Sequence, residues 1–181
     1  MKKLILLIFC VITILSTVQS QDFGYRTTDV GVEYQWQPKS QVFALHFAYN
    51  LQVHHSFQAR LGYTKTNWLD KGRNDNEEGS GFGGSLGYRY YIMVMPKDFF
   101  IGLRADIWQL KVFWERGTLK GTSNITALQP ALEMGYTFLL NDQIFITPAV
   151  TCGSQQNIKV EGRVTGEGLM LLMGVSAGWR F

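Results

Sequence analysis

Apolar and polar residues alternate with a period of two along most of the chain, which is typical of half-buried β-strands. Leu45 and Phe47 flank His46, for example, and the same alternation continues in both directions. Segments with this pattern cover residues 29–36, 43–50, 57–64, 82–90, 101–108, 128–138, 144–151 and 169–181. The pattern therefore predicts an all-β chain of eight strands, an even number that suits an up-and-down arrangement.

The two faces of these strands differ in side-chain size. One face carries large aliphatic and aromatic residues, and the other carries mostly glycine, alanine, serine, threonine and glutamine with isolated charges. The strand count alone also suits a soluble sandwich or a lipocalin-like barrel, but a solvated face normally carries more lysine and glutamate. Small residues fit the narrow interior of an eight-stranded barrel. We therefore expect a closed antiparallel transmembrane β-barrel, with the bulky face toward lipid and the polar face toward the lumen.

The connections between the strands alternate in length. If the N-terminus is periplasmic, the joins on that side are short, at 51–55, 95–98 and 140–142. The opposite joins are longer, at 66–81, 112–124 and 153–167, although the first, at 37–41, is brief. Short turns on one side and long loops on the other are the pattern of outer-membrane barrels.

Aromatic residues gather at the strand ends, where amphipathic rings would meet the two membrane–water interfaces. Trp36, Trp68 and Phe82 lie toward the expected extracellular side. The expected periplasmic ends carry Tyr49, Phe57, Tyr90, Phe99, Tyr136, Phe138, Trp179 and Phe181. This sorting by strand end supports a membrane barrel over a soluble sheet.

Two prolines interrupt the alternation. Pro130 and Pro148 are both in phase with the outward face of their strands. Proline cannot donate a ladder hydrogen bond and usually marks an edge or a bulge. Because a closed barrel has no edge, we expect local bulges at both positions.

The N-terminus has the composition of a secretory signal peptide. Two lysines precede an apolar run at 4–15, and Val18 and Ser20 suit cleavage after position 20. The run is shorter than the ~20 apolar residues that a spanning helix needs. We therefore expect residues 1–20 to be cleaved on export and residues 21–181 to form one barrel domain.

Charge and cysteine content add little chemistry. The net charge of +3 includes the two leader lysines, so the mature chain is nearly neutral and nothing indicates nucleic-acid binding. Without the leader, Cys152 is the one cysteine left. It cannot form an internal disulfide, and we interpret it as a small apolar residue.

The last strand, MLLMGVSAGWRF, ends on Phe181 with Trp179 two residues before it. Together with the eight alternating strands, this ending resembles the small eight-stranded outer-membrane β-barrel proteins of Gram-negative bacteria. The resemblance covers residues 21–181 and implies an outer-membrane protein in contact with membrane lipids and lipopolysaccharide. It also implies that Trp179 and Phe181 carry the signal read by the barrel-assembly machinery, although Ser176 stands where glycine is often seen. We expect a monomer.

Seven charged residues are predicted to face the lumen: Glu33, Arg60, Arg89, Arg104, Asp106, Glu133 and Arg180. Burying a lone charge is costly, so these side chains should pair with one another. We expect an internal salt-bridge network that plugs the barrel, with Glu133 close to Arg104 on the neighbouring strand. The alternative is a narrow, weakly anion-selective pore or a gate.

Catalysis has weak support. His54, His55 and Ser56 supply two of the residue types that nucleophilic catalysis needs, but adjacent residues at a strand end point apart. The small barrels known to be enzymes act on lipid A, and their histidine–serine motifs are not matched here. Two histidines without a third ligand do not predict a metal site, and no cofactor is expected.

Three functions therefore remain, in this order. The first is a non-enzymatic outer-membrane protein that acts in envelope integrity or surface interaction through its extracellular loops. The second is transport of a small solute through the lumen. The third is a lipid-A-modifying enzyme.

Overall fold

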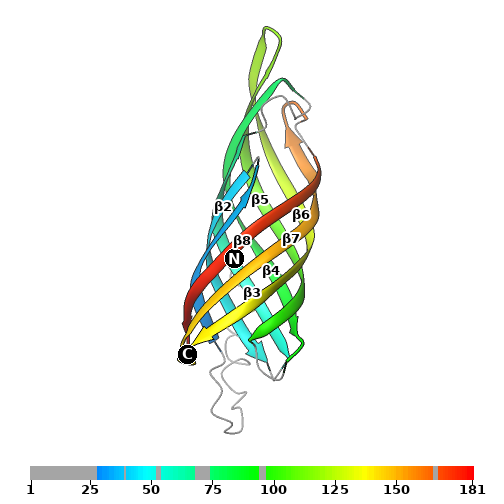
Figure 1. The fold of residues 1–181 in the computed structure, drawn as a ribbon. Coiled ribbons are helices and arrows are strands. Elements are labelled where there is room, and N and C mark those ends of the chain that lie inside the picture. Colours follow the sequence, from blue (N-terminus) through cyan, green and yellow to red (C-terminus); the bar gives the residue numbers. More distant parts are fainter. Residues whose placement is uncertain (1–27, 39, 52–53, 68–73, 94–96, 165–166) are drawn as a thin grey trace, which may run out of the picture.

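The computed structural model describes residues 28–38, 40–51, 54–67, 74–93, 97–164 and 167–181. Within them, each strand pairs antiparallel with the next, and the first and last strands pair to close a barrel (Figure 1). The strands are β1 (Thr28–Gln37), β2 (Ser40–Leu51), β3 (His55–Asn67), β4 (Asn76–Tyr91), β5 (Asp98–Arg116), β6 (Leu119–Leu140), β7 (Ile144–Glu161) and β8 (Gly168–Arg180). The predicted eight-stranded up-and-down barrel is confirmed.

Two sequence-based expectations fall on other residues. The leader at 1–20 and the rim residue Trp68 lie outside the described residues. In the part of the chain that is described, no helix is long and apolar enough to cross a membrane. Below, after the orientation expected from the sequence, the end at which β1 begins and β8 ends is called the periplasmic end, and the opposite end is called the extracellular end.

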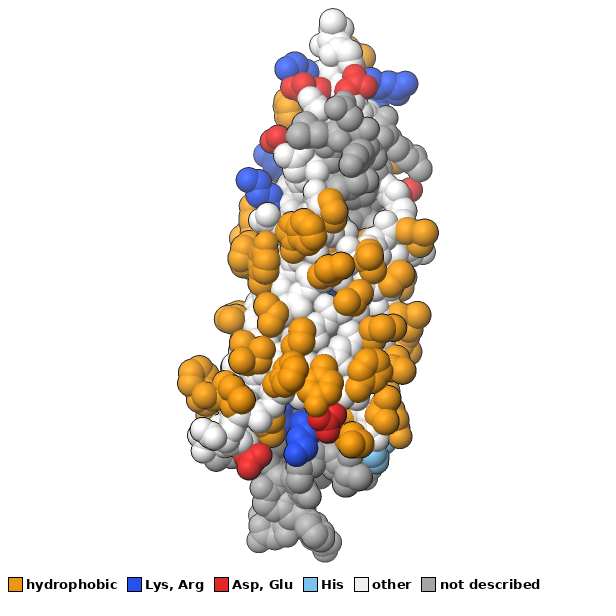
Figure 2. Space-filling model, in the orientation of Figure 1, with side chains coloured by type: hydrophobic (Ala, Val, Ile, Leu, Met, Phe, Trp, Pro, Cys, Tyr) orange, Lys and Arg blue, Asp and Glu red, His pale blue; other side chains and the backbone are white. Residues whose placement is uncertain are grey.

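The alternation of residue types along each strand becomes an alternation of exposure. On β5, Phe100 and Arg104 are buried in the lumen, whereas Ile101 and Leu103 are exposed on the outside. The same alternation runs around the barrel, so large apolar side chains form a belt across the visible face, with charged groups above and below it (Figure 2). Cys152 belongs to the outward set. The predicted assignment of faces therefore agrees with the structure.

The predicted long loops are wrong in extent at all three places, because the strands continue beyond the apolar belt; β4, for example, begins at Asn76 within the expected loop at 66–81. Residues 112–124 were expected to be a loop, but β5 and β6 run on to a two-residue turn at 117–118. Gly117 adopts a φ of +59° there, and its N–H donates a hydrogen bond to Asp75 at 2.7 Å. Likewise β7 extends to Glu161, through much of the expected loop at 153–167. Outside lipid, outward side chains become polar, so the alternation fades while the backbone ladder continues.

The prolines face outward as expected, but the expected bulges are wrong. Between β6 and β7 the pairing of Leu128 with Gln156 and of Ala131 with Gly153 keeps one register, so no residue is inserted at Pro130. The ladder instead lacks the pairs of Pro130 and Pro148 themselves and of the residue just before each, because proline has no N–H to donate. The register shift in this ladder lies at Thr126–Ala127.

Candidate functional site

The lumen holds a network of paired charges centred on Arg60. All seven predicted residues are buried there: Glu33, Arg60, Arg89, Arg104, Asp106, Glu133 and Arg180. Arg60 donates through Nη1 to Glu33 and through Nη2 to Asp106 at 2.8 Å. Its Nε donates to Ser85 at 2.6 Å. These partners lie on β1, β5 and β4, so one side chain on β3 joins four strands across the bore.

Glu133 pairs first with Arg89 rather than with its predicted partner Arg104. Arg89 donates to both carboxylate oxygens of Glu133, from Nε at 3.1 Å and from Nη2 at 3.0 Å. Arg104 Nη1 lies 3.7 Å from Glu133 Oε1, and Arg104 Nε lies 3.0 Å from Asp106 Oδ1. Arg104 also donates to Gln35 at 3.2 Å. Arg104 is therefore near Glu133, but its closer carboxylate is that of Asp106.

Arg180 pairs with Asp29 at the periplasmic end, and both of its hydrogen bonds measure 2.6 Å. Asp29 lies directly opposite Arg180 in the β1–β8 ladder, so this ion pair spans the seam that closes the barrel. The sequence placed Asp29 on the polar face but did not identify it as a partner. With Asp29, four carboxylates pair with the four arginines of this network.

His46 is a second lumen residue whose role sequence reasoning missed. Its Nδ1 lies 3.4 Å from Glu33 Oε2, and its ring lies 5.9 Å from that of Phe145. Neither of these two facing atoms makes a well-aligned hydrogen bond within the described lumen. The alternation places His46 on the inner face, but only the register of β1 with β2 brings it to Glu33.

Apolar side chains fill the bore on both sides of the charges. Toward the periplasmic end, Tyr91, Phe100 and Phe145 are almost fully buried, and the Arg89 guanidinium lies 4.2 Å above the Phe100 ring. Toward the extracellular end, a cluster consists of Val42, Trp108, Leu110, Val112, Ile125 and Ala127. Because eight strands leave only enough room for side chains, these two groups and the ion pairs make a packed interior.

Three aromatic residues on the inner face each lie beside a glycine that is their direct partner on the next strand. Phe100 pairs with Gly135, and Trp108 pairs with Gly83. Trp114 pairs with Gly121. In each pair a Cβ on the glycine would collide with the aromatic ring. The glycine-rich segment at 79–84 therefore includes space for a ring on the next strand.

The residues considered for catalysis do not come together. His54 Nδ1 lies 2.8 Å from the Tyr91 carbonyl oxygen, and His55 Nδ1 lies 2.5 Å from the Tyr88 hydroxyl. Ser56 is buried on the lumen side, and its hydroxyl has no hydrogen bond to another described residue. Within the described ranges, no three histidine, cysteine, aspartate or glutamate side chains lie close enough to hold a metal ion.

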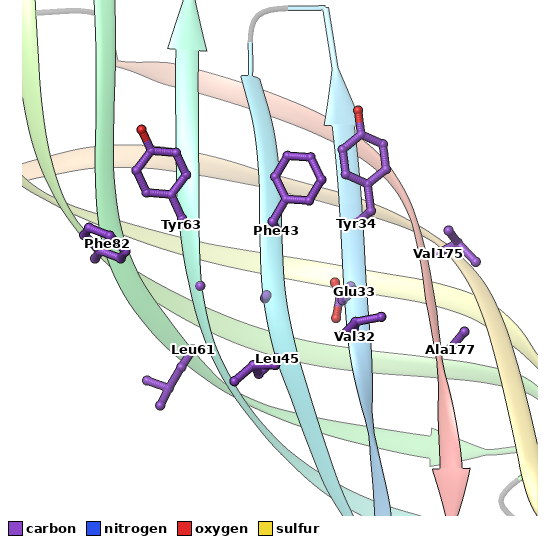
Figure 3. A pocket seen from close by; sticks show the side chains of 12 residues that line it. Val32, Glu33, Tyr34, Phe43, Leu45, Leu61, Tyr63, Phe82, Val175 and Ala177 are labelled. Atoms are coloured by element: carbon purple, nitrogen blue, oxygen red, sulfur yellow. The ribbon is translucent and has the colours of Figure 1, made fainter.

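The outer face carries a groove of about 740 Å³ that crosses β8, β1, β2, β3 and β4. In Figure 3, Tyr34, Phe43 and Tyr63 stand along one side, and Val32, Leu45 and Leu61 stand along the other. No pattern along a single strand predicts this groove, because its walls are assembled by the register of five strands.

Comparisons with known proteins address the fold. No protein-family model matches the chain, and no curated protein matches it in sequence. The structure is similar to the N-terminal β-barrel domain of Pseudomonas aeruginosa OprF, with a TM-score of 0.55, 12% identity and coverage of 87% of this chain and 98% of that domain. It is also similar to Ail, the attachment invasion locus protein of Yersinia pestis, with a TM-score of 0.53, 12% identity and coverage of 86% and 97%. The chain thus has the fold of the small eight-stranded outer-membrane β-barrels.

Proposed function

We propose that this chain is an integral outer-membrane protein that acts at the cell surface through its extracellular end, without enzymatic or transport activity. The observation that carries the proposal is a packed lumen beneath strands that continue beyond the apolar belt. A membrane location is supported by the outward residues Leu45, Leu61 and Phe82, whose exposed fractions are 67%, 71% and 72%. A continuous apolar surface of this kind needs a lipid or protein cover.

The packing of the lumen does not favour a transport function. The charged residues are engaged in ion pairs across the bore, and aromatic and aliphatic side chains fill the space on both sides of them. Breaking a buried ion pair is strongly unfavourable, so displacement of these side chains by a solute would cost much free energy. The second function considered from sequence, a narrow pore, therefore ranks below a surface role. A lipid-A-modifying enzyme ranks third, because His54, His55 and Ser56 are not assembled.

Side-chain contacts cross-link the strands of the extracellular extension of β4–β7. Trp114 Nε1 donates to Ser123 Oγ at 3.1 Å, and Ser123 Oγ donates to the Arg163 carbonyl at 2.8 Å. The Arg163 guanidinium lies 5.0 Å from the Trp114 ring centroid. On the outside, a hydrogen bond from Lys120 lowers the pKa of the Glu115 carboxyl. Rigid scaffolds that present polar residues at their ends commonly carry binding functions.

Cysteine labelling in intact cells tests the location and orientation. In a Cys152→Ser background, a cysteine at Thr118, in the turn of the extension, should react with a membrane-impermeant maleimide. A cysteine at Asn141, in the turn between β6 and β7, should react only after the outer membrane is permeabilised. Labelling of Asn141→Cys but not Thr118→Cys in intact cells would reverse the orientation. Labelling of neither, before or after permeabilisation, would remove the proposed location.

A further inference from the structure

One wall of the outer groove is a row of four aromatic rings. Tyr34 pairs with Phe43, Phe43 with Tyr63, and Tyr63 with Phe82, so the four residues are successive cross-strand neighbours on β1–β4. The ring centroids of Tyr34 and Phe43 lie 4.7 Å apart, and those of Tyr63 and Phe82 lie 5.1 Å apart. Cross-strand aromatic pairs of this kind stabilise one another, so the wall is preorganised.

The opposite wall and the floor are apolar too. Val32, Leu45 and Leu61 are each two residues nearer the periplasmic end than the rings, on the same strands. Between the two walls lie residues whose side chains turn to the lumen or are absent, such as Ala44 and Gly62, so the floor is largely backbone. Ala177 leaves one end open. The groove volume, about 740 Å³, is in the ~300–1,000 Å³ range of small-molecule sites.

The extracellular edge of the groove changes chemistry abruptly. The hydroxyl groups of Tyr34 and Tyr63 point away from the Leu45–Leu61 wall (Figure 3). Two residues beyond Tyr63 lies Lys65, which is exposed on the outer face and is joined through Ser80 to Lys111 in the same cross-strand row. Neither lysine has a carboxylate partner among the described residues, and two strand spacings separate them by roughly 10 Å.

We propose that this groove binds one acyl chain of a phosphorylated outer-leaflet lipid, whose phosphates lie beside Lys65 and Lys111. The inference rests on the proposed membrane location and orientation. The order of groups matches such a lipid: an apolar trough, then two phenolic hydroxyls, then two cations that have no carboxylate partner among the residues the structure describes. Two cations about 10 Å apart suit a headgroup with more than one phosphate.

Native mass spectrometry of the purified, refolded barrel in detergent tests the site with lipid A as the probe. Ala177→Phe places a ring in the open end of the groove and should reduce retained lipid A about tenfold, a change of one decade in affinity. Ala105→Phe is the matched control, because Ala105 is also exposed on the outside but lies on β5, away from the groove. It should retain lipid A as the unmodified protein does.

Two further variants test the proposed contacts of the lysines with the lipid headgroup. Lys65→Gln and Lys111→Gln should each weaken retention of lipid A about fivefold, the effect of one cation near an anionic membrane surface. Dephosphorylated lipid A should bind the unmodified barrel as weakly as lipid A binds the double variant. Phosphatidylethanolamine should be retained less than lipid A.

Three results would overturn the proposal. Equal retention of lipid A by Ala177→Phe and Ala105→Phe would remove the groove as the site. Equal retention of phosphatidylethanolamine would remove the phosphorylated ligand. A dimer that Ala177→Phe abolishes would assign the groove to a second copy. These measurements use folded barrels in detergent, each verified by its heat-dependent mobility on a gel. They are therefore independent of the cysteine labelling that tests the membrane location.

Discussion

Arg60 is the lumen side chain whose hydrogen bonds link four strands of the barrel. It pairs with Glu33 and Asp106 and donates to Ser85, with almost no exposure to solvent. A buried ion pair is weak evidence of net stability, because desolvation offsets the attraction. Removal of one partner is different, since it leaves the other charges buried without compensation.

Replacing Arg60 with Ala should therefore destabilise the barrel by about 3–5 kcal/mol, because Glu33 and Asp106 lose their shared cation. The measurement is equilibrium urea unfolding of the protein refolded in lipid vesicles. Asn67→Ala on the same strand is the control, because Asn67 is exposed on the outer face, and its effect should stay within about 0.5 kcal/mol. Equal losses for the two variants would show that the network adds nothing.

The glycine opposite Trp114 allows a second test at this scale. Gly121→Ala places a Cβ against the Trp114 ring, with no backbone atom in the way, and overpacking of this kind costs about 1–3 kcal/mol. In a Trp114→Leu background the same alanine should cost less, giving a measurable coupling energy. Hydrogen exchange of amides in 112–123 reports the local stability. Additive effects of the two changes would contradict the packing argument.

The ion-pair partners of the lumen charges could be predicted from the sequence only in part. The alternation predicted that seven charged residues face the lumen, and all seven lie there, because facing depends only on parity along a strand. It did not identify Arg89 as the main partner of Glu133, or Asp29 as the partner of Arg180. Those pairs depend on register and on which side chains reach across the bore. Neither the register nor the reach of a side chain across the bore can be read from the sequence of a single strand.

At the scale of the strand, the alternation of apolar and polar residues is clear where the outer face meets lipid. Every predicted strand is present. The part of each strand that was predicted is the part whose outward residues belong to the apolar belt. The missed segments, such as 112–116 on β5 and 119–124 on β6, lie beyond it, where both faces carry polar residues. Proline acted differently from expectation as well. Pro130 and Pro148 remove ladder bonds from the same pair of strands without shifting the register.

The assignment of faces on β6 can be tested with two small changes. In a Cys152→Ser background, Leu132→Cys should react with a lipid-phase thiol probe, whereas Ala131→Cys should be protected. Leu132 is exposed on the outside, and Ala131 packs inside against Met170 and Leu172. Because a slip of one residue exchanges the two faces, the reverse labelling would refute the register. Both variants change volume little, so both should fold.

At the scale of the whole molecule, the interior is a layered plug rather than a channel. The aromatic group of Tyr91, Phe100 and Phe145, the ion pairs, and the apolar cluster around Trp108 succeed one another along the bore. The outer groove also belongs to this scale, since it needs the closure of β8 onto β1. Sequence patterns could predict the barrel but not this groove.

The purified barrel should therefore pass no sustained current in a planar lipid bilayer. The lumen of eight strands has room for little beyond the side chains already in it. The preparation must first run as the heat-modifiable folded form, so that silence cannot be attributed to unfolded protein. A steady conductance from the unmodified barrel would contradict the plug and would restore the pore as the leading function.

The pair between Asp29 and Arg180 has a consequence for the order of folding. The two residues are 151 positions apart in the sequence, so their contact carries one of the largest loop-closure costs in the molecule's described part. Because it joins the last strand to the first, we expect it to form only after the other ladders are in place. Contacts made that late change the rate of unfolding more than the rate of folding. Asp29→Asn should therefore leave the refolding rate nearly unchanged and shorten the lifetime of the closed barrel, making this ion pair a kinetic latch on the finished structure.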